Sequence, residues 1–389
     1  MQLADRKNLI SEQFRQAYGE LPEIWVRAPG RVDLMGSHTD YNMGYVMTMT
    51  ISQDTWIAAR PRSDEQVCLR SLNIDGGSCF ELGNILHDQD VPWSNYVRGV
   101  AKIMQANGHR LKGFDGLIHS TIPFGSGLSS SAALEMASAI IFQQVSGFTL
   151  DPVQMALYGQ EAENKFVGVS TGILDQYSSA MGKEGCALLL DCRHLNSQNV
   201  QIFEGLRVVI CDTRAKRNLV GSEYDDRRKQ CEAGVAFLQK FYPDVRALRD
   251  VSLDKFLPHA GKMPELVARR CRFIIEENQR VLDLAAPLTA GDFDTLRQLL
   301  SASYAGARDL FEIGAPSMLA MIDAILNSPG VISGRQAGAG FGGCMVALVK
   351  TEQVEDFSSQ VQKQYQEKTG IAPRIFSIAA SAGAGLINW

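Results

Sequence analysis

The arrangement of apolar and polar residues divides the chain into short strands and longer helices. Short apolar or alternating runs predict strands at residues 24–28, 45–51, 55–60, 66–72, 114–120, 187–190, 206–211, 345–349 and 374–378. Apolar positions with a helical repeat predict helices at residues 1–18, 93–105, 128–144, 152–164, 174–181, 354–365 and through most of 221–300. Because strands and helices are grouped and do not alternate regularly, the pattern indicates an α+β fold.

Two features organise these elements along the chain. The dipeptide Pro29-Gly30 is expected to end the first strand. A shift in composition near residue 200 predicts an N-terminal domain, residues 1–200, and a C-terminal domain, residues 201–389, whose final strand could return toward the first. A chain of 389 residues is long enough for two such domains.

Composition and charge exclude several classes of protein. Apolar residues make up 45% of the chain and charged residues 21%, which is typical of a globular protein. The net charge is −5 and the chain has no basic stripe, so a nucleic-acid partner is not expected. No apolar run approaches the ~20 residues that span a bilayer, and the N-terminus lacks the apolar core of a signal peptide. The sequence therefore predicts a cytoplasmic protein with no membrane partner.

The eight cysteines are scattered along the chain. They form no Cys-x-x-Cys pair and have no zinc-site spacing with histidine. In a chain of this size, this pattern predicts reduced thiols in a cytosolic protein.

The segment Pro-Phe-Gly-Ser-Gly-Leu-Ser-Ser-Ser-Ala, residues 123–132, lies between a predicted strand and a predicted helix. Gly125 and Gly127 let the backbone approach a bulky ligand, and serines 129–131 stand where free N–H groups and the helix dipole favour an anion. This combination predicts a nucleotide-phosphate site, although a tight turn with a serine N-cap contains the same elements. The lysine of a Walker loop is absent, so a metal ion and backbone amides must offset the phosphate charge.

Two further segments concentrate polar residues or glycine. Residues 30–42 hold a dense set of hydrogen-bonding groups, which suits either a polyhydroxylated substrate or an exposed polar loop. Residues 338–343 match Gly-x-Gly-x-x-Gly but precede a strand instead of a helix, so we reject a dinucleotide site. This second segment is either a glycine loop packed against a ligand or the first loop, or a bulged hairpin.

Two acidic residues have positions that pattern alone leaves open. Asp175 lies among apolar residues at a predicted helix start, as either a helix-terminal charge or a functional carboxylate. Glu163 is either a solvated helix position or a functional carboxylate.

Several of these segments resemble one family, the GHMP small-molecule kinases, and are closest to galactokinases. Residues 30–42 resemble the galactokinase signature Gly-Arg-Val-Asn-Leu-Ile-Gly-Glu-His-Thr-Asp-Tyr-Asn, and residues 127–132 the phosphate loop Gly-Leu-Ser-Ser-Ser-Ala. Residues 338–344 resemble the third motif, Gly-Ala-Gly-Phe-Gly-Gly-Cys. Residues 172–176 and 222–231 resemble the segments that carry a catalytic aspartate and a sugar-binding tyrosine. Order and spacing agree over nearly the whole chain.

The resemblance implies a two-domain GHMP kinase, with a ribosomal-protein-S5-like N-terminal domain and a ferredoxin-like C-terminal domain. The active site would lie in the cleft between them. The implied reaction transfers the γ-phosphoryl group of ATP to the C1 hydroxyl of a small-molecule sugar, with ATP and Mg²⁺ as cofactors. The expected assembly is a monomer or a weak homodimer.

The resemblance also implies a role for each matching residue. Asp175 maps to the catalytic carboxylate, and Arg31 to the arginine that keeps it ionised and offsets charge on the phosphoryl group. Ser131 and Glu163 map to the magnesium ligands. The implied nucleotide contacts are Trp93, Gly125, Ser126, Gly127, Leu128, Ser129, Ser130 and Ser131, and the implied sugar contacts are Ser37, His38, Asp40, Gly172 and Tyr224.

Position 37 departs from the family pattern. The family has a glutamate there that contacts the C6 hydroxyl of the sugar, whereas Ser37 is shorter and neutral. Water could fill the gap and keep galactose as the substrate, or the space could admit a sugar that differs at C6, such as L-arabinose or galacturonate. Asp33 also departs from the pattern, since it replaces the usual asparagine.

Two other classes of protein fit less well. A kinase for mevalonate or homoserine would need fewer hydroxyl contacts than the cluster at residues 30–42 offers. A non-catalytic sugar and ATP sensor would have lost residues of the phosphate loop, whereas Ser131, Ala132 and Asp175 are all present.

Overall fold

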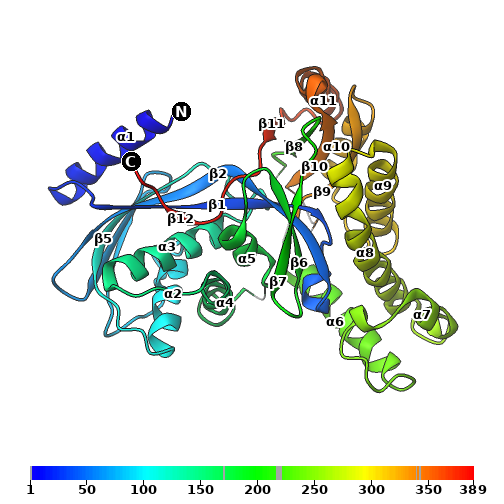
Figure 1. Ribbon diagram of the computed structural model, residues 1–389, viewed down its shortest axis with the longest axis horizontal. Helices are drawn as coiled ribbons and strands as arrows, with labels where there is room; N and C mark the ends of the chain where they lie inside the picture. The colour runs from blue at the N-terminus through cyan, green and yellow to red at the C-terminus, as the bar shows by residue number, and fades with distance from the viewer. Residues whose placement is uncertain (1, 170, 216–220, 339, 341–342) are drawn as a thin grey trace.

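The computed structural model of the chain describes all residues except 1, 170, 216–220, 339 and 341–342 (Figure 1). Its larger sheet has the strand order β12-β1-β2-β5-β3-β4, with β6 paired to β2 and β7 to β6. The strands are β1 (Ile24–Met35), β2 (Tyr45–Pro61), β3 (Gln66–Ser71), β4 (Gly77–Glu81), β5 (Phe114–Ser120), β6 (Cys186–Asp191), β7 (Asn196–Gln201) and β12 (Gly385–Leu386). Only the β3–β5 pair is parallel among the described pairings of this sheet.

Helices cover both faces of the larger sheet (Figure 1). On one face lies α1 (Leu3–Tyr18), which buries Ile10 and Phe14 against Trp25 and Trp56. The other face is covered by α2 (Ser94–Ala106), α3 (Ser130–Ser146), α4 (Pro152–Ala162) and α5 (Leu174–Met181). Of these, α3 packs directly on β1 and β2, so the start of α3 is held at the centre of the sheet.

The rest of the chain forms a smaller antiparallel sheet of four strands, in the order β11-β8-β10-β9. Its strands are β8 (Leu206–Asp212), β9 (Val331–Gln336), β10 (Cys344–Lys350) and β11 (Arg374–Ile378). The helices are α6 (Gly221–Leu238), α7 (Leu253–Ala260), α8 (Glu265–Ala290), α9 (Phe293–Asp309), α10 (Pro316–Leu326) and α11 (Val354–Thr369). No helix within the described part of the chain is both long and apolar enough to cross a bilayer.

The first strand does not end at Pro29-Gly30, contrary to the prediction. Strand β1 continues to Met35 through an irregularity in register between Pro29 and Arg31. A bulge accommodates the missing N–H of proline, which is why the ladder survives this dipeptide. Gly30 is required there, because a Cβ atom would lie 2.5 Å from the carbonyl oxygen of Leu128. The strand thus carries its polar residues against the loop that precedes α3.

The prediction of reduced cysteines is wrong for one pair. Cys68 on β3 and Cys79 on β4 lie directly opposite each other, with Cα atoms 4.2 Å apart, and form a disulfide. The apolar pattern does not predict strand β4, and without that strand nothing indicates that these two cysteines lie together. By contrast, Cys186, Cys211 and Cys271 are buried thiols, as predicted.

Candidate active site

The loop from residue 123 to 129 joins β5 to α3 and has an unusual backbone. Gly125, Gly127 and Ser129 have positive φ angles of 69°, 83° and 58°. Ser129 occupies the N-cap position, but the described structure has no hydrogen bond from its side chain to the helix N–H groups. The alternative of a plain turn capped by this serine is therefore not supported. The free N–H groups in the first turn of the 17-residue helix α3 point toward the space above the loop, where an anion could bind.

Internal contacts fix the shape of this loop. The hydroxyl of Ser126 donates to the carbonyl oxygen of Pro123 at 2.7 Å. Leu128 is buried, and its carbonyl oxygen accepts the backbone N–H of Arg31 at 3.2 Å. Among the described residues, the buried hydroxyl of Ser129 has no hydrogen-bond partner, which leaves it available to a ligand. The loop is thus preformed as an anion cradle.

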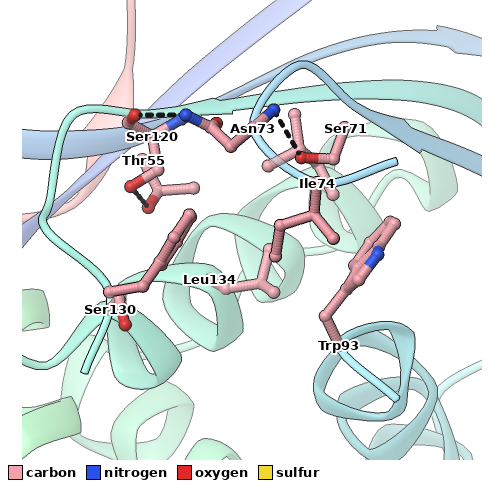
Figure 2. A pocket seen from close by; sticks show the side chains of 10 residues that line it. Thr55, Ser71, Asn73, Ile74, Trp93, Ser120, Ser130 and Leu134 are labelled. Carbon is pink, nitrogen blue, oxygen red and sulfur yellow. Dashed lines mark hydrogen bonds between the residues drawn. The ribbon is translucent and has the colours of Figure 1, made fainter. Parts of the chain in front are cut away.

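A mostly apolar pocket of about 340 Å³ opens beside this loop (Figure 2). Trp93, Ile74, Leu134 and Ser130 line it, and they come from three segments of the chain, since Ser130 and Leu134 both lie on α3. Asn73 lies at the edge of the pocket. Its side-chain amide donates to the carbonyl oxygen of Ser120 and accepts the backbone N–H of Ser120, so its polar atoms are already occupied. The shape and apolar walls suit a flat heterocyclic ring such as a nucleotide base.

Arg31 and Asp175 form an ion pair at the opposite side of the loop. Nη2 of Arg31 lies 2.5 Å from Oδ1 of Asp175, and Nη1 donates to the carbonyl oxygen of Gly127 at 2.6 Å. Although burial works in the opposite direction, the carboxylates of Asp175 and Asp33 raise the pKa of Arg31. Arg31 is therefore a fixed positive charge that touches both the loop and the carboxylate. The Asp175 side chain is 24% exposed, so it can meet a substrate.

Glu163 lies next to the start of α3 and is held by three hydrogen bonds. Its carboxylate accepts from Ser131, from the hydroxyl of Thr171 at 2.8 Å and from the amide of Gln176 at 2.8 Å. Burial, followed by the nearby charge of Asp175, raises the pKa of Glu163. A bound cation would relieve that burial penalty, and a hydroxyl with one carboxylate suits Mg²⁺ when phosphate and water complete the shell. Among the described residues, no group of three or more His, Cys, Asp or Glu side chains is arranged to hold a metal ion by itself.

The sugar-contact residues expected from the sequence also converge. Gly172 touches Asp40 so closely that a Cβ atom would lie 1.8 Å from Oδ2 of Asp40. The ring of Tyr224 lies 5.3 Å from the ring of His38, and Nδ1 of His38 lies 3.0 Å from the hydroxyl of Tyr41. Burial raises the pKa of Asp40 to about 6, and the charge of Asp175 adds to this effect. The two carboxylates therefore face a shared space.

The second glycine segment lies partly outside the described residues, because 339, 341 and 342 are not described. Gly338 is described, and a Cβ atom there would be 3.4 Å from the carbonyl oxygen of Gly127 and 3.9 Å from Arg31. At Gly338, the described part of this segment nearest the site, the backbone therefore lies close to the first glycine loop as predicted.

Comparisons with known proteins agree with this geometry. Models of the galactokinase galactose-binding signature, the GHMP kinase N-terminal domain and the GHMP kinase C-terminal region match residues 12–61, 95–183 and 284–367. A galactokinase from Roseiflexus sp. is 41% identical over 97% of this chain and 96% of its own length. The chain belongs to the galactokinases of the GHMP kinase family. It is therefore an ATP-dependent sugar kinase, and the expected α+β GHMP kinase fold is confirmed.

Solved structures place this galactokinase-family chain in the same fold. The crystal structure of Lactococcus lactis galactokinase complexed with galactose has a TM-score of 0.93 and 30% identity, and the match covers 98% of this chain and 99% of that one. A mevalonate kinase from Methanococcus jannaschii has a TM-score of 0.63 and 16% identity over 94% of this chain and 98% of its own. At that identity, the second likeness concerns the fold alone.

Sequence reasoning missed several residues of this galactokinase-family site. Gln176 donates to Glu163 and also to the buried carboxylate of Glu135 at 2.9 Å, so it ties the two acids together. Burial, followed by the charge of Glu163, raises the pKa of Glu135 well above its usual range. Arg335 on β9 reaches Ser37 across the sheets. Of these residues, only Gln176 could have been found from the sequence, because it directly follows Asp175.

Proposed function

We propose that this protein transfers the γ-phosphoryl group of ATP to the C1 hydroxyl of galactose, giving galactose 1-phosphate and ADP. The observation that carries the proposal is the Arg31–Asp175 pair, which lies between the phosphate cradle and the cluster around Asp40. A hydroxyl held at Asp175 would meet a phosphoryl group held at the start of α3. The names of the Roseiflexus and Lactococcus relatives support galactose as the sugar.

Asp175 accepts the proton of the C1 hydroxyl or orients that hydroxyl for attack. A weak base is sufficient, because phosphoryl transfer has a loose transition state in which positioning and charge stabilisation dominate. Arg31 pairs with Asp175 and directs positive charge at the site where charge develops on the phosphoryl oxygens. The hydrogen bond from Arg31 to the carbonyl oxygen of Gly127 fixes the position of the guanidinium group relative to the phosphate loop.

Ser131 and Glu163 would hold the magnesium ion. Mg²⁺ would offset the negative charge of the phosphates, which the loop cannot do alone without a lysine. Trp93 would pack on the adenine ring in the apolar pocket. Gly125, Ser126, Leu128 and the other residues of the loop would contact the phosphates through their backbone.

The identity of the sugar depends on the surroundings of position 37. The hydroxyl of Ser37 accepts from Nη2 of Arg335 at 3.2 Å, and both side chains are buried. Nε and Nη1 of Arg335 have no hydrogen-bond partner among the described residues. These donors favour a second candidate, a sugar with a carboxylate at C6 such as galacturonate, whereas L-arabinose would leave them unmet.

We further propose that the protein works in the cytoplasm, where ATP is available, as a monomer or weak homodimer. The alternative of another class, a non-catalytic sensor, does not fit a galactokinase-family chain of this kind. An intact Asp175 and an intact phosphate loop favour the enzyme.

One experiment tests the proposed function. ADP release is measured in a coupled assay with galactose, L-arabinose, galacturonate, N-acetylgalactosamine and glucose, each over a range of concentrations. We expect the highest kcat/KM with galactose. A higher value with galacturonate would establish the second candidate, and no ADP release with any sugar would refute the kinase.

A further inference from the structure

The side chain of Asp33 is buried in the site, yet the proposed mechanism gives it no role. It lies on β1 two residues after Arg31, so both side chains leave the strand on the same face. Oδ1 of Asp33 lies 2.9 Å from Nε of Arg31, and the Asp33 side chain is 4% exposed. A buried carboxylate requires compensation for its lost hydration, which Arg31 supplies here.

The guanidinium group of Arg31 is consequently contacted by three different parts of the fold, and the contact with Asp33 is an ion pair that lacks the alignment of a hydrogen bond. Nη1 binds the phosphate loop at Gly127, Nη2 binds Asp175 on α5, and Nε faces Asp33. A guanidinium group is planar and rigid, so fixing one edge fixes the direction of the other two. Asp33 holds the edge that faces away from the substrate.

Asp33 also connects Arg31 to the C-terminal half of the chain. Its carboxylate accepts the backbone N–H of Gly338, and it feels the charge of Arg335 on β9. Asp33 therefore contacts Arg31, whose side chain binds the first glycine loop at Gly127. It also contacts the backbone of Gly338, which belongs to the second glycine segment.

We propose that Asp33 is a positioning residue of this site: it orients Arg31 between Asp175 and the phosphate loop, anchors the backbone of Gly338, and through its charge sets the pH range of activity. This inference rests on the proposed function, because activity is what the test measures.

The charges around Asp33 determine the direction of the pH effect. Arg31 from its own strand and Arg335 from β9 stabilise its ionised form, whereas Asp175 from α5 and Asp40 from the segment before β2 disfavour it. Burial is the largest influence and raises the pKa of Asp33. Each negative charge in this cluster makes it easier to protonate the others, so removing one carboxylate makes the rest harder to protonate.

The test is the pH–rate profile of Asp33→Asn with ATP and galactose. Asparagine can still accept from Gly338 but carries no charge. We expect the acid limb of kcat/KM to move to lower pH by about one unit. At the plateau we expect kcat to fall by less than about tenfold and both KM values to stay within about threefold, since the Asp33 side chain is only 4% exposed. If Asp33→Asn does not fold, Asp33→Ser, which also keeps an acceptor for Gly338, must show the same shift.

A matched control separates this role from a merely structural ion pair. Asp54 on β2 is also buried and pairs with Arg6 at 2.5 Å and Arg27 at 2.9 Å, on the face of the sheet covered by α1. Asp54→Asn should leave the acid limb in place. If the acid limb of kcat/KM stays at the same pH in a folded Asp33 variant, the inference about Asp33 is overturned and the proposed function still stands. A wild-type protein that phosphorylates no sugar refutes the proposed function and the inference together.

Discussion

Replacing Gly172 by alanine tests the geometry of the sugar side most directly. An added Cβ atom would lie 1.8 Å from Oδ2 and 2.7 Å from Cγ of Asp40. Favourable carbon–oxygen contacts need roughly 3.5 Å, so the carboxylate must retreat by about 1.5 Å or more. Gly172 does not have a positive φ angle, so alanine adds no backbone strain there. The substitution therefore moves one carboxylate and leaves the fold intact.

The cost follows from the hydrogen bond that Asp40 would lose. A bond of about 2.8 Å to a sugar hydroxyl would lengthen beyond 4 Å and cease to exist. Hydrogen bonds to charged groups contribute about 1.5–3 kcal/mol. The kcat/KM for the sugar should fall roughly 10- to 150-fold, because each 1.4 kcal/mol is a factor of ten. The KM for ATP should not change, since the nucleotide pocket lies on the far side of the phosphate loop.

The assay is coupled ADP release with sugar varied at saturating ATP, and then ATP varied at saturating sugar. Gly261→Ala is a matched control, because no atom lies within 4 Å of its added Cβ and its φ angle is −70°. It should behave like the wild type. A Gly172→Ala protein that is folded and keeps its kcat/KM for the sugar within twofold would show that Asp40 does not contact the substrate.

Four further changes have defined outcomes. Asp175→Asn should reduce kcat at least about 100-fold while calorimetry shows unchanged ATP binding, and near-normal turnover would contradict its role as the base. Ser131→Ala should raise the Mg²⁺ concentration needed for half-maximal activity about tenfold or more, and an unaltered titration would assign the metal to another serine. Ser37→Glu should increase the preference for galactose over galacturonate, and an unchanged ratio would mean that position 37 does not face C6. Reducing the Cys68–Cys79 disulfide should lower the free energy of unfolding by about 2–3 kcal/mol, as measured by thermal unfolding with and without reductant. Reductant should not change the melting temperature of a variant in which both Cys68 and Cys79 are replaced by serine. An equal melting temperature of the wild type with and without reductant would contradict the prediction.

Much of the fold could be predicted because the local pattern matches the final structure. The helix at residues 174–181 and the strand at 114–120 have the same bounds in the structure, since their apolar residues pack in the expected period. Strands β4 and β7 were missed, because both are short and largely exposed and carry little apolar signal. In α1, the apolar Leu3 is 68% exposed, whereas the charged Arg6 is buried through its ion pair with Asp54, so the identity of a residue does not alone decide its burial.

The site could be located but not assembled from the sequence. Motif spacing identified Asp175, Glu163 and Arg31, since each lies in a segment with strong local constraints. The contact between Arg31 and Asp175 spans more than a hundred positions and depends on how β1 crosses the loop before α3. That crossing needs β1 to continue through Pro29-Gly30, which local propensity alone argues against. Long-range register is the information that a single sequence does not carry.

The pairing of β12 with β1 has a consequence for how the protein is made. Leu386 pairs with Val26, and the N–H of Ile387 donates to the carbonyl oxygen of Trp25. The ribosome delivers residues 385–387 long after it has delivered the strands they complete. Until then, the outer edge of β1 is exposed and open to pairing with another chain. The N-terminal sheet therefore cannot be completed before residues 385–387 have been synthesised, and the nascent chain is most prone to misassociation while the segment that precedes them is being translated.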